Sequence, residues 1–173
     1  MITFLVEENN PLNQKFYDDC ILCLQLHQLK CSCKHSGCLH AHGGYERKVK
    51  TLEGSFMLKV FRVRCSECGR THAVLPSSIV PYSQMTLVCC CQVITSLIDN
   101  ADVNSVCNDY PDVDENNVKS VIRRYKKHWA QRLMSERISL APVKALVLAC
   151  FSHYSAQFMQ VHRTFNCIFL NTT

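Results

Sequence analysis

The sequence has no long apolar run and nothing that resembles a secretory leader. No stretch approaches the roughly 18 consecutive apolar residues that a membrane span requires, so we expect no membrane partner. The opening residues, MITFLVEENN, lack a basic start and reach acidic residues after a short apolar run, which argues against a signal peptide. From these absences we expect a cytoplasmic protein in a reducing compartment, where paired cysteines indicate metal binding more often than disulfides.

The sequence also lacks internal repeats and low-complexity tracts. Its 173 residues are 47% hydrophobic and 19% charged, which is an ordinary globular composition. Wholesale disorder is therefore not expected, because the chain has enough apolar surface to bury. A chain of this length is long enough for one domain with a real core or for two small domains.

Basic residues are missing from one central block. Residues 73–118 contain six acidic residues and no Lys or Arg, whereas residues 30–72 and 119–137 each carry a net charge of +6. Two basic blocks separated by an acidic one suggest two patches that meet a polyanion. The alternative is two solvated faces, and the carboxylates of residues 99–115 would repel phosphate unless they point away from it.

Cysteine, in contrast, is abundant, with thirteen residues. Zinc prefers four soft or borderline ligands in a tetrahedron, and two short-spaced pairs on separate loops supply them. Cys65 and Cys68 form one pair, followed by Gly69, which permits the positive φ that such a turn often needs. The other pair is predicted to be Cys31 and Cys33, with alternates at Cys38 and His42.

A structural Zn²⁺ is therefore expected, and the alternative is a cysteine-rich loop with free thiols. A catalytic zinc would need three protein ligands, an open position and a nearby general base. His40, His42 and Glu46 are the only hint of such a site. We therefore predict that the protein is not an enzyme.

The hydrophobic pattern predicts an α+β fold in two modules. Residues 1–76 are expected to hold an N-terminal helix over 12–29 and a zinc-ribbon-like β-hairpin over 45–52 and 55–64, with a turn at Glu53-Gly54. Residues 75–83 contain two prolines and read as a linker. Residues 77–173 are expected to form a helical, helix-turn-helix-like bundle, with helices over 84–98, 102–108, 115–133 and 140–160.

The middle of this second module has the spacing of a helix-turn-helix. A short helix precedes a turn at Tyr110-Pro111, and Asp114 is a suitable N-cap for the long helix that follows. The second helix of this motif places its N-terminal residues at base edges, here Asn116, Asn117, Lys119 and Ser120. Phosphate contacts are expected from Arg123, Arg124, Lys126, Lys127 and Arg132 and, on the hairpin, from Arg47, Lys48, Lys50, Arg62 and Arg64. The alternative is a solvated helix whose valines pack inward.

Three segments taken together, CSCKHSGCLHAHGGYERKV, RVRCSECGRTHAVLPSSIVPYS and VDENNVKSVIRRYKKHW, carry a resemblance. Over about residues 30–165 the chain resembles a family of short uncharacterised bacterial mobile-element proteins, similar to the N-terminal zinc-finger and helix-turn-helix region of insertion-sequence transposases. The Cys-x-x-Cys-Gly-x-Thr-His segment at 65–72 is its most specific part. The resemblance implies that the four paired cysteines bind metal and that helix 115–133 is a recognition helix.

Together these features predict a zinc-stabilised, non-catalytic DNA-binding protein of transposase-like or mobile-element origin, with double-stranded DNA as partner. The alternative is a mobile-element adaptor or inhibitor that binds a protein or nucleoprotein partner through its basic face. Nothing in the sequence sets an oligomeric state.

Overall fold

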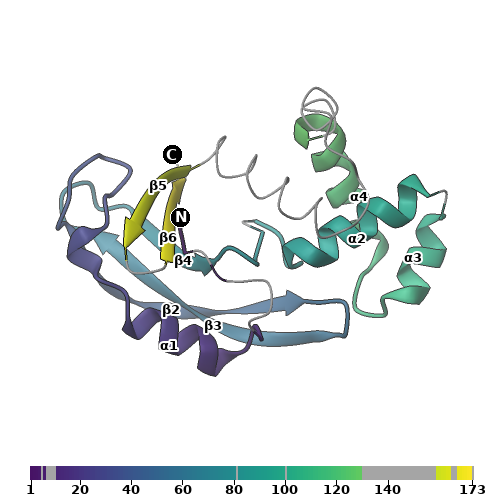
Figure 1. The fold of residues 1–173 in the computed structure, drawn as a ribbon, viewed down its shortest axis with the longest axis horizontal. Helices are drawn as coiled ribbons and strands as arrows, with labels where there is room; N and C mark the ends of the chain where they lie inside the picture. Colours follow the sequence, from purple (N-terminus) through teal and green to yellow (C-terminus); the bar gives the residue numbers. More distant parts are fainter. Residues whose placement is uncertain are drawn as a thin grey trace. The chain divides into compact units, whose positions relative to one another are not determined.

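The computed structural model describes residues 1–4, 6, 11–80, 82–99, 101–129, 159–164 and 167–172, with side chains up to Lys127. The fold is α+β, as predicted (Figure 1). In chain order the elements are β1 (Ile2–Phe4), α1 (Gln14–Leu22), a 3₁₀ turn (Leu26–Gln28), β2 (Leu39–Lys50), β3 (Ser55–Cys65), β4 (Thr71–Pro76), α2 (Leu87–Ile98), α3 (Val103–Asp109), α4 (Glu115–Arg124), a π-helical turn (Tyr125–Trp129), β5 (Met159–Thr164) and β6 (Cys167–Thr172).

The strands form one mixed sheet in the order β2-β3-β4-β1-β6-β5. β3 pairs antiparallel with β4, and β1 runs parallel to β4 with Ile2 opposite Val74. β6 pairs antiparallel with both β1 and β5. Four of these strands, β1, β4, β5 and β6, were not predicted. Each has only three to six residues, and β1 joins β4 to β6 across a long sequence separation, which local patterns do not reveal.

The helix predicted over 140–160 can be compared with the structure only at its last two residues, and these are not helical. Residues 140–158 lie outside the described part of the chain, and residues 159–160 belong to β5. The described C-terminal residues therefore join the sheet and not a helical bundle.

The chain divides into two compact units. Unit 1 comprises Met1–Arg47, Met57–Pro81 and Ser155–Thr173, and unit 2 comprises Lys48–Phe56 and Tyr82–Tyr154. The tip of the β2–β3 hairpin thus belongs with the helices. The predicted linker over 75–83 is wrong at its start, because Pro76 ends β4 and both Ile79 and Val80 are buried.

In unit 1, helix α1 lies against the sheet. Asn13 caps its first turn by accepting the N–H of Phe16 at 2.9 Å. Tyr17 is buried, its hydroxyl donates to the carbonyl of Val74 at 2.8 Å and it accepts the N–H of Phe61 at 2.8 Å. Burial raises the pKa of Tyr17, so the hydroxyl keeps its proton. This one side chain connects α1 with β3 and β4.

In unit 2, helices α2, α3 and α4 contact one another. Each begins at a residue whose side chain accepts a backbone N–H: Thr86, Asp102 and Asp114. Asp114 and Asn117 form a complete capping box at the start of α4. Val106, Val118 and Val121 are buried between the helices. The helix predicted over 115–133 is thus helical as far as 129, and residues 130–133 lie outside the described segments.

The hairpin turn lies at the predicted Glu53-Gly54, where Thr51 donates its N–H to the carbonyl of Gly54 at 2.7 Å. Beside it, the backbone of Lys50 pairs with the segment that leads into α2, through Gln84 and Thr86. In the part of the chain described, no helix is both long and apolar enough to cross a bilayer.

Candidate metal centre and basic surfaces

Four cysteine sulfurs from two loops meet at the base of the hairpin. The Sγ atoms of Cys31, Cys33, Cys65 and Cys68 all lie within 4.8 Å of one another. The distance from Cys31 to Cys68 is 3.5 Å and that from Cys33 to Cys65 is 3.7 Å. A zinc ion with Zn–S bonds of about 2.3 Å needs sulfurs about 3.8 Å apart, so this donor set fits a tetrahedral ion. The four cysteines could therefore hold a metal ion.

Two tight turns aim these sulfurs at one point. In the first, Lys34 donates its N–H to the carbonyl of Cys31 at 2.9 Å and adopts a φ of 72°. In the second, Gly69 donates its N–H to the carbonyl of Cys65 at 3.0 Å with a φ of 69°, as the sequence predicted for this glycine. The β2–β3 hairpin lies between the two turns in the sequence. Because its two strands run antiparallel, the start of β2 and the end of β3 are close, which brings residues 31–33 and 65–68 together.

The two alternates lie outside this group. Cys38 directs its thiol to the carbonyl of His35 at 3.3 Å, and burial raises its pKa to about 11. His42 is exposed on β2. Among the described residues, the group able to hold a metal consists of the four cysteines without Cys38 or His42.

Two histidines that the sequence did not identify touch the cluster. Nε2 of His72 lies 3.2 Å from Sγ of Cys31, and Nδ1 of His35 lies 3.4 Å from Sγ of Cys33. His72 is buried on β4, and burial lowers its pKa, which favours the neutral ring with one N–H to donate. The Cys-x-x-Cys-Gly-x-Thr-His segment places His72 just after the second turn, but whether its ring reaches the cluster depends on which way β4 faces.

The cluster also favours ionised sulfur at one position. Burial opposes ionisation of Cys65, but the backbone N–H of Cys68 and three neighbouring thiols outweigh it and lower the pKa of Cys65 to about 6. A thiolate is the form that binds metal.

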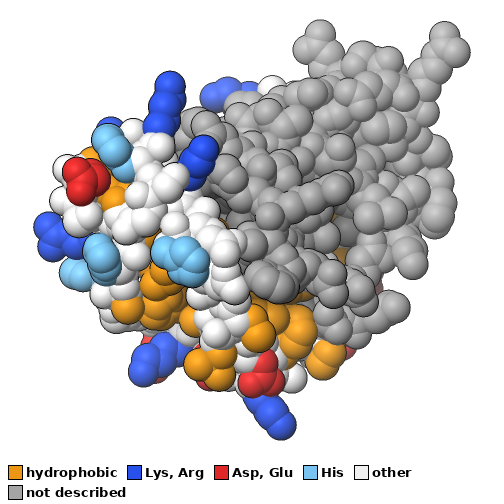
Figure 2. Space-filling view, turned by 60° about the vertical axis from the view of Figure 1, so that its left-hand side comes forward, with side chains coloured by type: hydrophobic (Ala, Val, Ile, Leu, Met, Phe, Trp, Pro, Cys, Tyr) orange, Lys and Arg blue, Asp and Glu red, His pale blue; other side chains and the backbone are white. Residues whose placement is uncertain are grey.

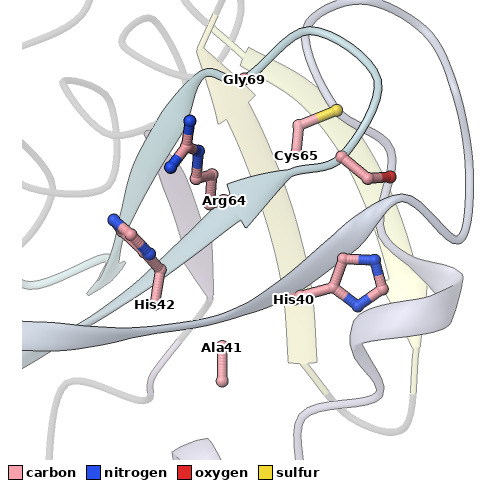
Figure 3. A pocket seen from close by; sticks show the side chains of 7 residues that line it. His40, Ala41, His42, Arg64, Cys65 and Gly69 are labelled. Carbon is pink, nitrogen blue, oxygen red and sulfur yellow. The ribbon is translucent and has the colours of Figure 1, made fainter.

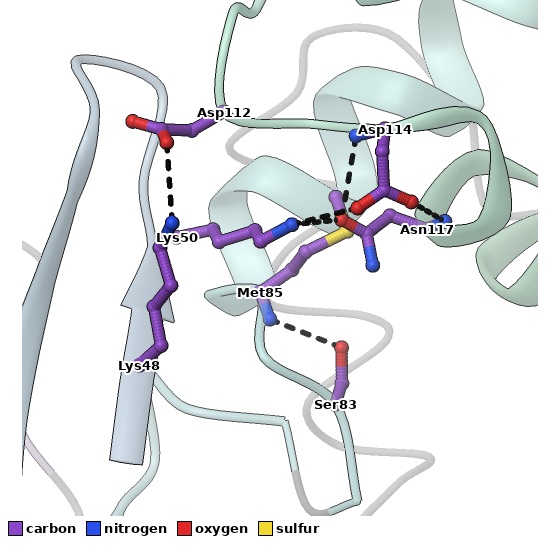
Figure 4. Close-up of polar contacts among 7 residues, drawn as sticks. All are labelled: Lys48, Lys50, Ser83, Met85, Asp112, Asp114 and Asn117. Atoms are coloured by element: carbon purple, nitrogen blue, oxygen red, sulfur yellow. Dashed lines mark hydrogen bonds and ion pairs between the residues drawn. The ribbon is translucent and has the colours of Figure 1, made fainter.

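In unit 2, several residues predicted to contact DNA are bound to other side chains of the same unit (Figure 4). Nζ of Lys50 lies 2.9 Å from Oδ2 of Asp114 and also contacts Oδ1 of Asn117. Lys48 pairs with Asp112 at 3.5 Å. Lys119 pairs with Glu115 at 2.7 Å. Lys50 and Asn117 are thus committed to contacts within unit 2.

The rest of the predicted α4 set lies at or near the surface. Asn116, Arg123, Lys126 and Lys127 are exposed, and Ser120 is half-buried. Arg124 is half-buried and donates to the carbonyl of Tyr82 at 3.4 Å. Arg132 lies outside the described residues.

In unit 1, Arg47 donates to the carbonyl of Val80 at 3.0 Å. Arg62 is half-buried on β3, and Arg64, two residues on, is exposed. Figure 2 shows histidine and basic side chains gathered on the face that comes forward, with few acidic groups among them.

The comparison with curated proteins and that with solved structures each give no match. A family model described as a domain of unknown function, DUF6431, matches residues 30–125. This segment contains all four clustered cysteines, the hairpin and helices α2 to α4. Because the match covers more than half of the chain, the protein belongs to the DUF6431 family.

Proposed function

We propose that this protein is a zinc-stabilised, non-catalytic DNA-binding protein. The observation that carries the proposal is the exposed basic surface of α4 and of the π-helical turn after it. In unit 2, α4 follows a short helix and a turn in a three-helix arrangement. The cysteine cluster supports the proposal, because a metal bound there would stabilise unit 1 without a catalytic role.

Zinc is the metal that a set of four thiolates at these distances suits best. Cys31, Cys33, Cys65 and Cys68 would hold it, and the ion would cross-link the two turns at the base of the hairpin. Four protein ligands complete a tetrahedral shell and leave no open position for a reacting water, so the role is structural.

Helices α3 and α4, joined by the turn at 110–113, are the helix-turn-helix of this proposal. Asn116 and Ser120 lie near the N-terminus of α4, where the second helix of such a motif reads base edges. Arg123, Lys126 and Lys127 lie further along and suit phosphates. Asn117 is left out of the base-reading residues and Lys50 out of the phosphate contacts, because the two side chains bind each other.

The acidic residues just before α4 would repel DNA phosphate if their charges were free, but both are paired with lysines. Asp112 pairs with Lys48, and Asp114 pairs with Lys50 while it caps the helix. These contacts offset much of the repulsion that two free carboxylates would exert on phosphate. The mobile-element origin is likewise a proposal, supported by the likeness of the three sequence segments.

The engaged lysines also favour a second candidate, an adaptor that binds a protein or nucleoprotein partner. Lys48, Lys50 and Lys119 each hold a carboxylate, which leaves fewer basic side chains for a polyanion. Such an adaptor would use the same metal-stabilised scaffold and would have no affinity for bare duplex.

A duplex titration at several salt concentrations, on full-length protein of measured zinc content, tests the proposal. Affinity should fall steeply with salt, because bound lysine and arginine displace counterions from phosphate. The double variant Arg123→Ala/Lys126→Ala should lower the slope of log K against log salt by about two. Lys15→Ala/Lys59→Ala is the matched control, because it removes two exposed charges from unit 1.

If folded, zinc-loaded protein shows no duplex binding at low salt, the DNA-binding proposal is wrong and the adaptor function is favoured. Equal losses of affinity in Arg123→Ala/Lys126→Ala and in Lys15→Ala/Lys59→Ala would contradict the assignment of the binding surface to α4 and the turn after it.

A further inference from the structure

We propose that unit 1 carries its own phosphate-binding site, in a hollow between β2 and the turn that follows β3. The hollow has a volume of about 320 Å³ and is lined by His40, Ala41, His42, Arg64, Cys65, Ser66 and Gly69 (Figure 3). We infer that the hollow binds a phosphate of a nucleic-acid backbone. The choice of nucleic acid as the source of this phosphate rests on the proposed function.

Three donors converge on this hollow from two paired strands. His40 and His42 are two residues apart on β2, so strand alternation turns both rings to the same side of it. Arg64 comes from β3, and its guanidinium lies 3.9 Å from the position that a Cβ on Gly69 would occupy. The guanidinium of Arg64 thus lies within van der Waals reach of the turn at Gly69.

These donors are available to a ligand. Among the described residues, His40, His42 and Arg64 are exposed and make no hydrogen bond or ion pair. Lys48 and Lys50 in unit 2 differ, because each is paired with a carboxylate. An exposed cluster of donors without partners is what an anion site presents before its ligand arrives.

The charge around the hollow also favours an anion, since no acidic residue lines it. Ser66 is not counted as a donor, because its hydroxyl bonds to the carbonyl of Cys38 at 3.4 Å and to Oε1 of Glu67 at 3.3 Å. Glu67 is thus the carboxylate next to the site, and its charge works against an anion.

Phosphate is the anion that these donors match. A guanidinium offers a planar fork of N–H groups that binds phosphate oxygens in pairs, and a neutral imidazole donates one N–H more. Apart from the buried Cys65, the residues that line the hollow are exposed, whereas sites for small metabolites enclose most of the ligand. An open site of this kind suits one phosphate of a polymer that continues past it.

The test uses full-length, zinc-loaded protein and two probes. Duplex titrations compare Arg64→Ala and His40→Ala/His42→Ala with Lys59→Ala, which removes one exposed charge from β3 outside the hollow. We expect Arg64→Ala to weaken duplex binding about tenfold and to lower the salt slope by about one, with little change in Lys59→Ala. Arg64→Lys should recover part of the loss, and Glu67→Gln should tighten binding. The second probe is inorganic phosphate, which should shift the imidazole NMR signals of His40 and His42 in the wild type but not in Arg64→Ala.

The outcomes separate this inference from the proposed function. Equal duplex binding by Arg64→Ala and Lys59→Ala, with no phosphate-induced shift, overturns the phosphate site even if the α4 variants lose binding. Phosphate-induced shifts in a protein that binds no duplex support the anion site and contradict the proposed function. Zinc content measured for each variant shows that an affinity loss does not come from loss of the metal.

Discussion

Lys50 is a lysine whose side chain is only 7% exposed, and its ammonium group is held by Asp114 and Asn117. Asp114, in contrast, is 56% exposed at the start of α4. The two partners therefore differ in what they lose when the other is removed. A buried ammonium without a counter-ion is costly, whereas an exposed carboxylate without one is solvated by water.

From this asymmetry we predict that Asp114→Asn destabilises the protein more than Lys50→Met does. Asn caps a helix about as well as Asp, so Asp114→Asn keeps the cap and removes only the charge. Lys50→Met removes the buried charge itself and should cost about 1 kcal/mol or less. Urea denaturation of both variants at pH 7 measures the order, and the double variant Lys50→Met/Asp114→Asn should be no less stable than Asp114→Asn alone. If Lys50→Met were the more destabilising variant, the ammonium group of Lys50 would not be left buried without a counter-ion in Asp114→Asn.

The same pair predicts a pH dependence. The hydrogen bond from Lys50, together with the backbone N–H of Asn117, holds the pKa of Asp114 below its ordinary value. Since the folded-state pKa is the lower one, this contribution is present above the unfolded-state value near 4 and is lost as the pH falls through the folded value. Carboxyl ¹³C titration should place the pKa of Asp114 higher in Lys50→Met, and an unchanged pKa would contradict the pairing.

At the scale of the element, the β2–β3 hairpin carries both the cysteine turns and the proposed phosphate site. Two adjacent glycines in β2 meet different constraints. A Cβ on Gly44 would lie 2.8 Å from the carbonyl oxygen of Val60, so β3 runs too close for any side chain. Gly43 has open space around it but a φ of 71°.

We predict that Gly44→Ala destabilises unit 1 by about 1–3 kcal/mol, because β2 must move away from β3. Gly43→Asn is the matched control, since asparagine tolerates a positive φ and meets no neighbour there, so it should cost under about 1 kcal/mol. Thermal denaturation of zinc-loaded protein gives both values. Similar values for the two variants would show that the close approach to Val60 does not limit the hairpin.

At the scale of the whole molecule, all four cysteines that could hold a metal belong to unit 1, and unit 2 has its own buried helix contacts. Removal of the metal should therefore act on one unit first. We predict that a chelator raises amide hydrogen exchange in β2, β3 and β4 of unit 1 much more than in α2, α3 and α4. Equal loss of protection in both units would mean that the metal stabilises the whole chain.

Two cysteine variants serve as controls for this experiment. Cys33→Ser removes a cluster sulfur and should lower the zinc bound per chain and reproduce the effect of the chelator. Cys38→Ser changes a nearby thiol outside the cluster and should retain the metal. If Cys38→Ser loses the metal and Cys33→Ser retains it, then Cys38 and not Cys33 is the fourth ligand.

Much of the candidate site could be predicted because its signals are local. The spacing of Cys65, Cys68 and Gly69 specifies one tight turn, and the Glu53-Gly54 turn brings the first cysteine pair back to it. The contribution of His72 was missed, because it depends on which way β4 faces and not on a ligand spacing.

The sequence by itself determined the α+β class, the four clustered cysteines, the turn of the hairpin and the starts of α3 and α4. Each of these follows from interactions within a few residues, such as a cap, a turn or a repeating apolar position. Only the tertiary structure decided that β1 pairs with β4, that Lys50 and Asn117 bind each other, and that His40, His42 and Arg64 share one hollow. Those contacts join residues more than twenty positions apart, and they depend on which strands pair and which side chains are buried, which no local pattern encodes.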